Sequence, residues 1–139
     1  MYQSDWILRQ IEMMGLAFRR LADALRERRP EEALEVSREA VGELLDGDPS
    51  LIDHMTGEGL VALLSAGGAL DAFKAHVLAE LLVARSNAYA ELGRRDAAEW
   101  ERRRAQVLLR ALLPEAKGAE RERVLELAAW LETDGPPVG

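Results

Sequence analysis

Apolar residues recur at steps of three and four along most of the chain, a spacing that predicts amphipathic helices. The first such pattern covers residues 5–28, and its apolar face is formed by Ile7, Ile11, Met14, Phe18, Leu21 and Leu25. A second pattern runs from Pro30 to about Leu45, and a proline followed by two glutamates favours a helix start there. Because only a short connection separates the two patterns, they predict an antiparallel helical hairpin over residues 5–46.

The second half of the chain repeats this organisation. A wide apolar pattern over residues 69–92 predicts a central helix, and Gly93 stands where a helix commonly ends. A further helix is expected between Gly93 and Pro114, so residues 70–113 form a second candidate hairpin. Between the hairpins, residues 49–70 fit one short helix capped by Thr56, and a last helix is expected over residues 118–131.

These elements together predict an all-α protein, since no run of β-branched residues alternates with polar ones. A chain of 139 residues with 48% hydrophobic side chains can bury a core of its own. We therefore expect one helical domain over residues 1–133, built from five to six helices in antiparallel hairpins. Residues 134–139 contain glycine and proline, and we expect them to form a flexible C-terminal tail.

Residues 79–114 resemble a tetratricopeptide repeat. The large, small, aromatic, glycine and two alanine positions of that repeat are matched by Leu82, Ser86, Tyr89, Gly93, Ala98 and Ala105, whereas Arg85, Arg102 and Arg110 depart from it. A second, weaker copy can be placed on residues 17–50, although any two alanine-rich hairpins align about as well. The resemblance implies a right-handed array of helical hairpins.

Over nearly its full length, the chain also resembles an uncharacterised bacterial family of unknown function. The similarity includes the N-terminal segment YQSDWILRQIEMMG and a later LAELL segment that precedes the repeat-like hairpin. This resemblance implies a fold without an assigned activity. No catalytic residue follows from it.

Charge and composition exclude several classes of protein. With 25 acidic and 18 basic residues, the net charge of -7 argues against a nucleic-acid partner, because phosphate binding needs a basic surface. The chain has no cysteine, no signal-peptide pattern and no apolar run of the length that spans a membrane. We therefore expect a cytoplasmic location and no membrane partner.

The polar residues predict no catalytic, cofactor or metal site. His76 and Glu80 share a helix face, but two ligands do not make a metal site, so we interpret them as an ordinary side-chain pair. The glycines at positions 57, 59, 67 and 68 match no phosphate-binding motif, and we interpret them as residues that start and end helices. Arginine clusters at residues 26–29 and 102–104 are interleaved with glutamates, which favours solvated ion pairs; these would be the places to look for bound nucleic acid.

The first helix has the strongest candidate interaction surface. Its residues, both near the N-terminus and along the inner face of the weaker repeat copy, are Trp6, Leu8, Met13, Gly15, Phe18, Ala22 and Leu25. The alternative is that this strip is buried against the chain's own third or last long helix. In the better copy, the inner face has Glu80, Val83, Asn87, Ala90 and Glu91, too acidic to capture a terminal carboxylate.

The pattern as a whole favours a non-enzymatic scaffold that binds a protein or peptide partner, or a second copy of itself as a homodimer. The alternative is a regulatory module that binds a small molecule between its helices. An arginine at a repeat position that is usually apolar motivates this alternative, and the candidate pocket residues are Arg85, Tyr89 and Trp100. An enzyme ranks third, because no catalytic constellation can be identified.

Overall fold

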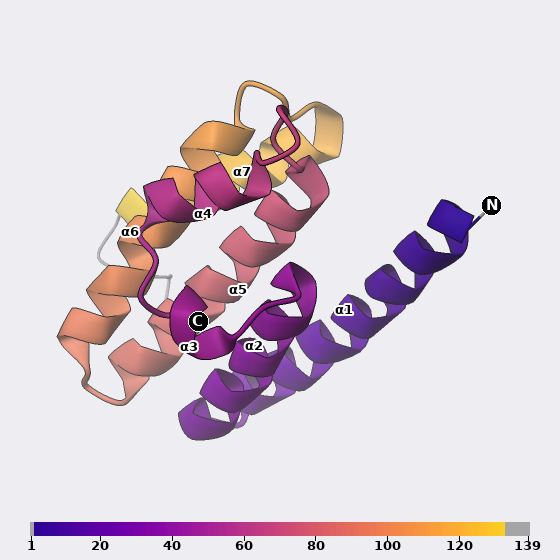
Figure 1. The fold of residues 1–139 in the computed structure, drawn as a ribbon. Coiled ribbons are helices and arrows are strands. Elements are labelled where there is room, and N and C mark those ends of the chain that lie inside the picture. Colours follow the sequence, from indigo (N-terminus) through magenta and orange to yellow (C-terminus); the bar gives the residue numbers. More distant parts are fainter. Residues whose placement is uncertain (1, 133–139) are drawn as a thin grey trace.

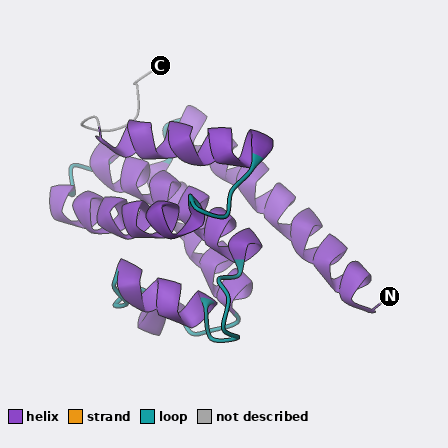
Figure 2. Ribbon diagram, turned by 90° about the horizontal axis from the view of Figure 1, so that it is seen from above, coloured by secondary structure: helices purple, strands orange, loops and turns teal. Residues whose placement is uncertain are grey.

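The computed structural model of the chain describes residues 2–132, with the side chains of residue 12 and of residues 14–132. These residues form seven helices without any strand (Figures 1 and 2), which confirms the all-α prediction. The helices are α1 (Tyr2–Arg26), α2 (Pro30–Leu45), α3 (Pro49–Ile52), α4 (Gly57–Leu64), α5 (Ala72–Glu91), α6 (Arg95–Leu112) and α7 (Gly118–Glu132). The predicted tail over residues 134–139 lies outside the described residues.

The helix count exceeds the expected five to six because residues 49–64 form two short helices in place of one. The side chain of Asp48 accepts a hydrogen bond from the backbone N–H of Ser50 at 2.9 Å, which starts α3 at Pro49. The Thr56 hydroxyl then accepts from the Gly59 N–H at 3.1 Å and caps α4, as predicted. Two N-caps within nine residues therefore divide this segment.

The long helices begin and end close to the predicted positions. The helix expected over residues 69–92 begins only at Ala72, because Asp71 accepts a hydrogen bond from the Lys74 N–H at 3.1 Å and acts as its N-cap. Gly93 follows α5 with a φ of 76°, the left-handed conformation that glycine adopts at least cost. This turn brings α6 back along α5.

The helices are arranged as two hairpins with further helices around them. α1 and α2 form the first hairpin, and α5 and α6 form the second, in which the two helices share the most extensive contact of the fold. α2 packs on α5 and joins the hairpins, while α4 lies on α6 and α7 contacts both α5 and α6. α1 is the outermost helix, and its N-terminal part extends away from the rest (Figure 1).

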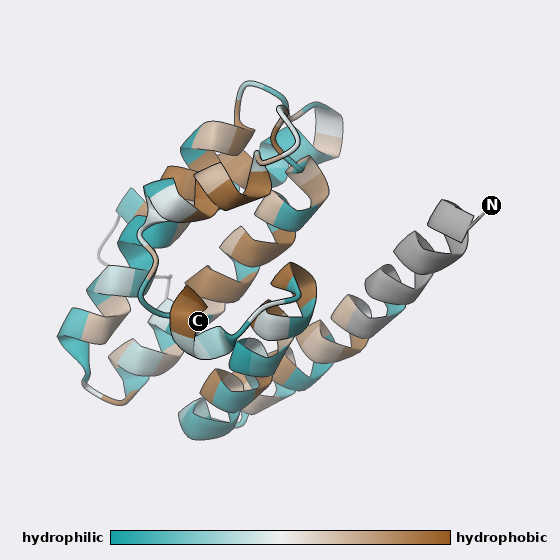
Figure 3. Ribbon diagram, viewed as in Figure 1, coloured by the Kyte–Doolittle hydropathy of each residue, from teal (hydrophilic) through white to brown (hydrophobic). Residues whose placement is uncertain are grey.

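The core is centred on α5, as the wide apolar pattern predicted. Helix α5 contacts α1, α2, α4, α6 and α7, and many hydrophobic residues lie on α4 and α5 (Figure 3). Its fully buried leucines, Leu78, Leu81 and Leu82, pack with Leu44 of α2 and Leu108 of α6. Phe73, near the N-terminus of α5, has 41% of its surface exposed and lines a hollow between α1 and α7.

Gly57 starts α4, but it also has a packing role that the sequence did not reveal. A Cβ atom at this position would lie 2.7 Å from the Cβ of Val107 and 3.2 Å from the Cα of Arg104. Both distances are shorter than an ordinary van der Waals contact, and the second involves backbone of α6. The absence of a side chain at Gly57 thus allows α4 to approach α6 closely.

We expect Gly57→Ala to lower the free energy of unfolding by about 1–3 kcal/mol, because the added methyl group forces α4 and α6 apart. Gly67→Ala is the matched control, since a Cβ there would meet nothing within 4 Å. That variant should change stability by less than about 0.5 kcal/mol. Urea unfolding of both variants measures the difference, and equal effects would contradict the close approach.

No helix among residues 2–132 combines the length and the hydropathy needed to cross a lipid bilayer.

Candidate functional site

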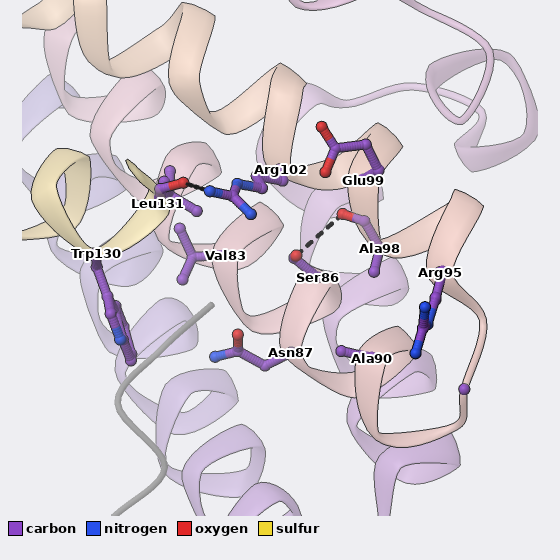
Figure 4. A pocket seen from close by; sticks show the side chains of 11 residues that line it. Val83, Ser86, Asn87, Ala90, Arg95, Ala98, Glu99, Arg102, Trp130 and Leu131 are labelled. Carbon is purple, nitrogen blue, oxygen red and sulfur yellow. Dashed lines mark hydrogen bonds between the residues drawn. The ribbon is translucent and has the colours of Figure 1, made fainter. Parts of the chain in front are cut away.

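A groove of about 610 Å³ runs along α5 between α6 and α7 (Figure 4). Its lining from α5 is Val83, Ser86, Asn87 and Ala90; from α6, Arg95, Ala98, Glu99 and Arg102; and from α7, Trp130 and Leu131, with Gly93 at the turn. Figure 4 shows Trp130 on one side and Arg95 on the other, with Asn87 between them.

Small residues shape the floor of the groove. The Ser86 hydroxyl donates to the backbone carbonyl of Ala98 at 3.0 Å, which joins α5 to α6 (Figure 4). Ala98 and Ala90 add only a methyl group each, so neither fills the space above. The guanidinium of Arg102 donates to the backbone carbonyl of Leu131 and holds the end of α7 against α6. The groove is therefore held open by contacts among three helices.

The polar lining of the groove includes the side-chain amide of Asn87, whose hydrogen-bonding groups are not used within the described part of the chain. Asn87 is half-buried, and its side chain makes no hydrogen bond to any group in residues 14–132. A primary amide offers both donors and an acceptor. Arg95 and Glu99 are exposed at the rim and add charges of opposite sign. The groove thus combines an apolar wall at Trp130 with polar groups able to pair with a peptide backbone.

The repeat-like inner face coincides with part of this groove. Of its five positions, Val83, Asn87 and Ala90 line the groove, whereas Glu80 lies farther toward the N-terminus of α5 and Glu91 is exposed outside the lining. Trp130 and Leu131 had not been singled out as site residues, and Arg102 had been named only as part of an arginine cluster and as a departure from the repeat. Their contribution depends on how α7 lies across α5, and helical periodicity contains no signal for that.

Two arginines and one glutamate are buried together between α5 and α6. The exposed fractions are 5% for Arg85, 2% for Glu101 and 3% for Arg104. Nε of Arg85 donates to one carboxylate oxygen of Glu101 at 2.6 Å, and Nε of Arg104 donates to the other at 3.1 Å. One carboxylate thus pairs with two guanidinium groups away from solvent.

The Nη1 groups of the two arginines reach outside this hairpin. Their acceptors are the carbonyl of Leu34 and the hydroxyl of Ser37 for Arg85, each at 2.9 Å, and the carbonyls of Ile52 (2.9 Å) and Met55 (3.2 Å) for Arg104. Hydrogen bonds therefore compensate the buried charges. The network ties α2 and the segment around α3 to the α5–α6 hairpin, which is a structural role.

This burial corrects the interpretation of the arginine-rich segments. Arg104 is buried, not solvated, because Glu101 and two carbonyls surround its guanidinium. Elsewhere the solvated ion pairs are confirmed: exposed Arg103 pairs with Glu99 at 3.2 Å, and in the segment 26–29 two arginines pair with neighbouring carboxylates.

The candidate pocket residues are only partly brought together. Nη2 of Arg85 donates to the Tyr89 hydroxyl at 3.2 Å, and the guanidinium lies 5.6 Å from the centre of that ring. Trp100 instead lies against Arg104, 5.4 Å from ring centre to guanidinium, and donates to the Asp53 carbonyl at 3.2 Å. A small-molecule site at these residues stays a prediction, and the groove is lined by other residues.

The predicted pair of His76 and Glu80 is confirmed as part of a larger cluster. Nε2 of His76 lies 3.1 Å from a carboxylate oxygen of Glu80. Arg123 of α7 donates to both oxygens of the same carboxylate, from Nη2 at 2.8 Å and from Nε at 3.0 Å. Within the described residues, no three histidine or acidic side chains are close enough to share a metal ion. The cluster joins α5 to α7.

These contacts shift the pKa values of the pair in opposite directions. Burial by itself raises the pKa of Glu80, but the hydrogen bonds from His76 and Arg123 outweigh it and lower that pKa from its usual 4.5 to about 2. The hydrogen bond to Glu80 raises the pKa of His76 above its usual 6.5, against the effect of burial. The ionised forms of both side chains are favoured.

The interaction strip predicted on α1 is partly exposed. The side chains of Trp6, Leu8 and Met13 lie outside the described residues. Gly15 and Ala22 are exposed, while Phe18 and Leu25 are half-buried. The core face of α1 is formed by Met14, Leu21 and Ala24. Self-association through the strip stays a prediction.

Comparisons of the chain with protein-family models, with curated proteins and with solved structures found no match. The candidate sites therefore rest on the geometry of the groove and of the clusters beside it.

Proposed function

We propose that the protein is a non-enzymatic helical interaction module whose groove along α5 binds an extended segment of a partner protein. The observation that supports this most is the Asn87 side chain, whose amide has no hydrogen-bond partner among the described residues and lies half-buried in the groove. Because the Asn87 amide lies between the indole of Trp130 and the small side chains of Ala90 and Ala98, it suits a ligand that has both hydrogen-bond donors and acceptors.

The backbone of an extended peptide is such a ligand. It presents one N–H and one C=O per residue, so the Asn87 amide can pair with both. Ala90 and Ala98 leave room for the main chain to approach α5 and α6 closely. The indole of Trp130 offers apolar area for a side chain of the partner, and aromatic residues frequently dominate the binding energy of such interfaces. No catalytic role is needed for any of these groups.

The proposal extends to the wider architecture. The close contact of α5 with α6, with small residues at their crossing, supports a tetratricopeptide-like arrangement of the hairpins, and the addition of α7 beside α5 supports a short right-handed array. In the same proposal the protein acts in the bacterial cytoplasm on another protein. No observation favours the small-molecule alternative in the same specific way.

Selection of a random peptide library on the full chain tests this function. We expect enriched peptides, and we expect their addition to shift the indole N–H resonance of Trp130 and the amide resonances of Asn87 and Ala90. The indole of Trp100, outside the groove, is the internal control and should move little. Peptides that shift Trp100 but leave Trp130 unchanged would contradict the proposal.

A further inference from the structure

A second hollow lies on α5, closer to its N-terminus, between α1 and α7. Its volume is about 360 Å³, which is at the small end of the range for ligand pockets, about 300–1,000 Å³. It is lined by Phe18 of α1, by Phe73, His76, Val77 and Glu80 of α5, and by Glu120 of α7. We call this hollow the crevice. It has room for one long side chain.

The two carboxylates that line the crevice differ in how well they are paired. Arg123 and His76 already pair with Glu80, so that carboxylate is satisfied. Glu120 is 45% exposed, and its only ion pair within the described residues is a 3.9 Å approach to Nδ1 of His76. Whenever the imidazole is neutral, the Glu120 carboxylate therefore has no ion pair within the described residues.

The two phenylalanine rings add a second feature that favours a cation. The face of an aromatic ring attracts a positive charge within about 6 Å. A planar guanidinium can stack on such a face while it donates hydrogen bonds to a carboxylate, whereas an ammonium is more compact and more strongly hydrated. Phe73 is a large apolar side chain with 41% of its surface exposed at this site, which a stacked guanidinium would cover. The lining thus suits arginine better than lysine.

We infer that the crevice binds an arginine side chain of the partner segment that occupies the groove. This inference rests on the proposed function in so far as the arginine belongs to that segment. Both hollows lie along α5: Val77 and Glu80 of the crevice are followed, at steps of three and four residues, by Val83, Asn87 and Ala90 of the groove. From Val77 to Asn87 the helix rises about 15 Å, which an extended chain spans with about five residues.

Titration of the full chain with N-acetylarginine amide, followed by nuclear magnetic resonance, tests the crevice separately. We expect saturable shifts confined to the amides around Phe73, Val77 and Glu120. The lysine analogue should bind more weakly than arginine, and the citrulline analogue, which has nearly the same shape but no charge, at least about tenfold more weakly. Equal binding of citrulline, or shifts spread over the whole acidic surface, would overturn the inference.

Two substitutions locate the interaction. Glu120→Gln and Phe73→Ala should each weaken arginine binding by about tenfold or more. Glu122→Gln is the matched control, because Glu122 is an exposed glutamate on the same helix that does not line the crevice. Loss of binding in the control, or unchanged binding in Glu120→Gln with its fold intact, would contradict the assignment.

Binding of the arginine probe should also weaken as the pH falls. Glu80, Glu120 and Arg123 are the charged groups that act on His76 from α5 and α7. Protonation of His76 places a cation beside Glu120, where it competes with the guanidinium. Probe binding that strengthens below neutral pH would argue against competition by His76.

A groove variant separates the crevice from the proposed function. Ala90→Arg in the groove should leave binding of the small probe unchanged, so failure of the groove and failure of the crevice give different results.

Discussion

Glu101→Ala is expected to lower the free energy of unfolding by about 3–5 kcal/mol, the range observed when one partner of a buried ion pair is removed. The carboxylate of Glu101 is 2% exposed and pairs with both Arg85 and Arg104. Without it, two guanidinium groups stay buried with only neutral acceptors. Since small domains have only about 5–15 kcal/mol of stability, the loss is a large part of the total. Chemical denaturation followed by circular dichroism measures it.

Glu99→Ala serves as the control for this prediction. Glu99 lies on the same helix and also pairs with an arginine, Arg103, but both side chains are exposed. Such surface pairs contribute about 0–1 kcal/mol. Glu101→Gln retains the side-chain volume and one hydrogen-bond acceptor, so its loss of unfolding free energy should lie between those of Glu101→Ala and Glu99→Ala. This variant also keeps the comparison possible if Glu101→Ala does not fold. Equal losses for Glu101→Gln and Glu99→Ala would show that the buried network does not stabilise the hairpin.

The second large effect is a dependence of the stability on pH through Glu80 and His76. The folded pKa of Glu80, about 2, lies below its usual 4.5, so its ionised form stabilises the fold above pH 4.5 and the contribution is lost as the pH falls toward 2. The full shift corresponds to at most about 3 kcal/mol, and the part-exposed Arg123 reduces it. The raised pKa of His76 acts in the opposite sense: its contribution is complete below 6.5 and is lost as the pH rises through the folded value.

The difference in stability between the wild type and Glu80→Gln should therefore be largest between about pH 4.5 and 6.5. Unfolding curves measured from acid to neutral pH for both proteins give this difference. Glu126→Gln is the control, because Glu126 also pairs with Arg123 but its side chain is 68% exposed. A difference that stays constant with pH would mean that the cluster does not couple α5 to α7.

Local signals in the sequence were sufficient for most helix boundaries. Pro30 and Thr56 mark the starts of α2 and α4, and Gly93 marks the end of α5, each through interactions within one helical turn. All three helix boundaries agree with the prediction. The N-caps Asp48 and Asp71 act in the same way, but they were not singled out. As a result α3 was missed and α5 was expected to start too early.

The sites were harder to predict because they depend on contacts between distant helices. Arg85 was noticed as an arginine at a position that is usually apolar, yet its partner Glu101 is sixteen residues away on another helix. The crevice requires Phe18 and Phe73 to meet across α1 and α5, and the groove requires Trp130 to lie over α5. Periodicity within one helix says which face is apolar, but not which helix covers it.

The central claim is that the groove along α5 receives a segment of a partner, and calorimetric titration of a selected peptide into three proteins tests it most directly. Ala90→Arg fills the groove, whereas Ala62→Arg places the same side chain at an exposed helical alanine of α4 outside it. We predict equal affinity for the wild type and Ala62→Arg, and a loss of at least about tenfold for Ala90→Arg. Equal affinity for all three proteins would contradict the claim.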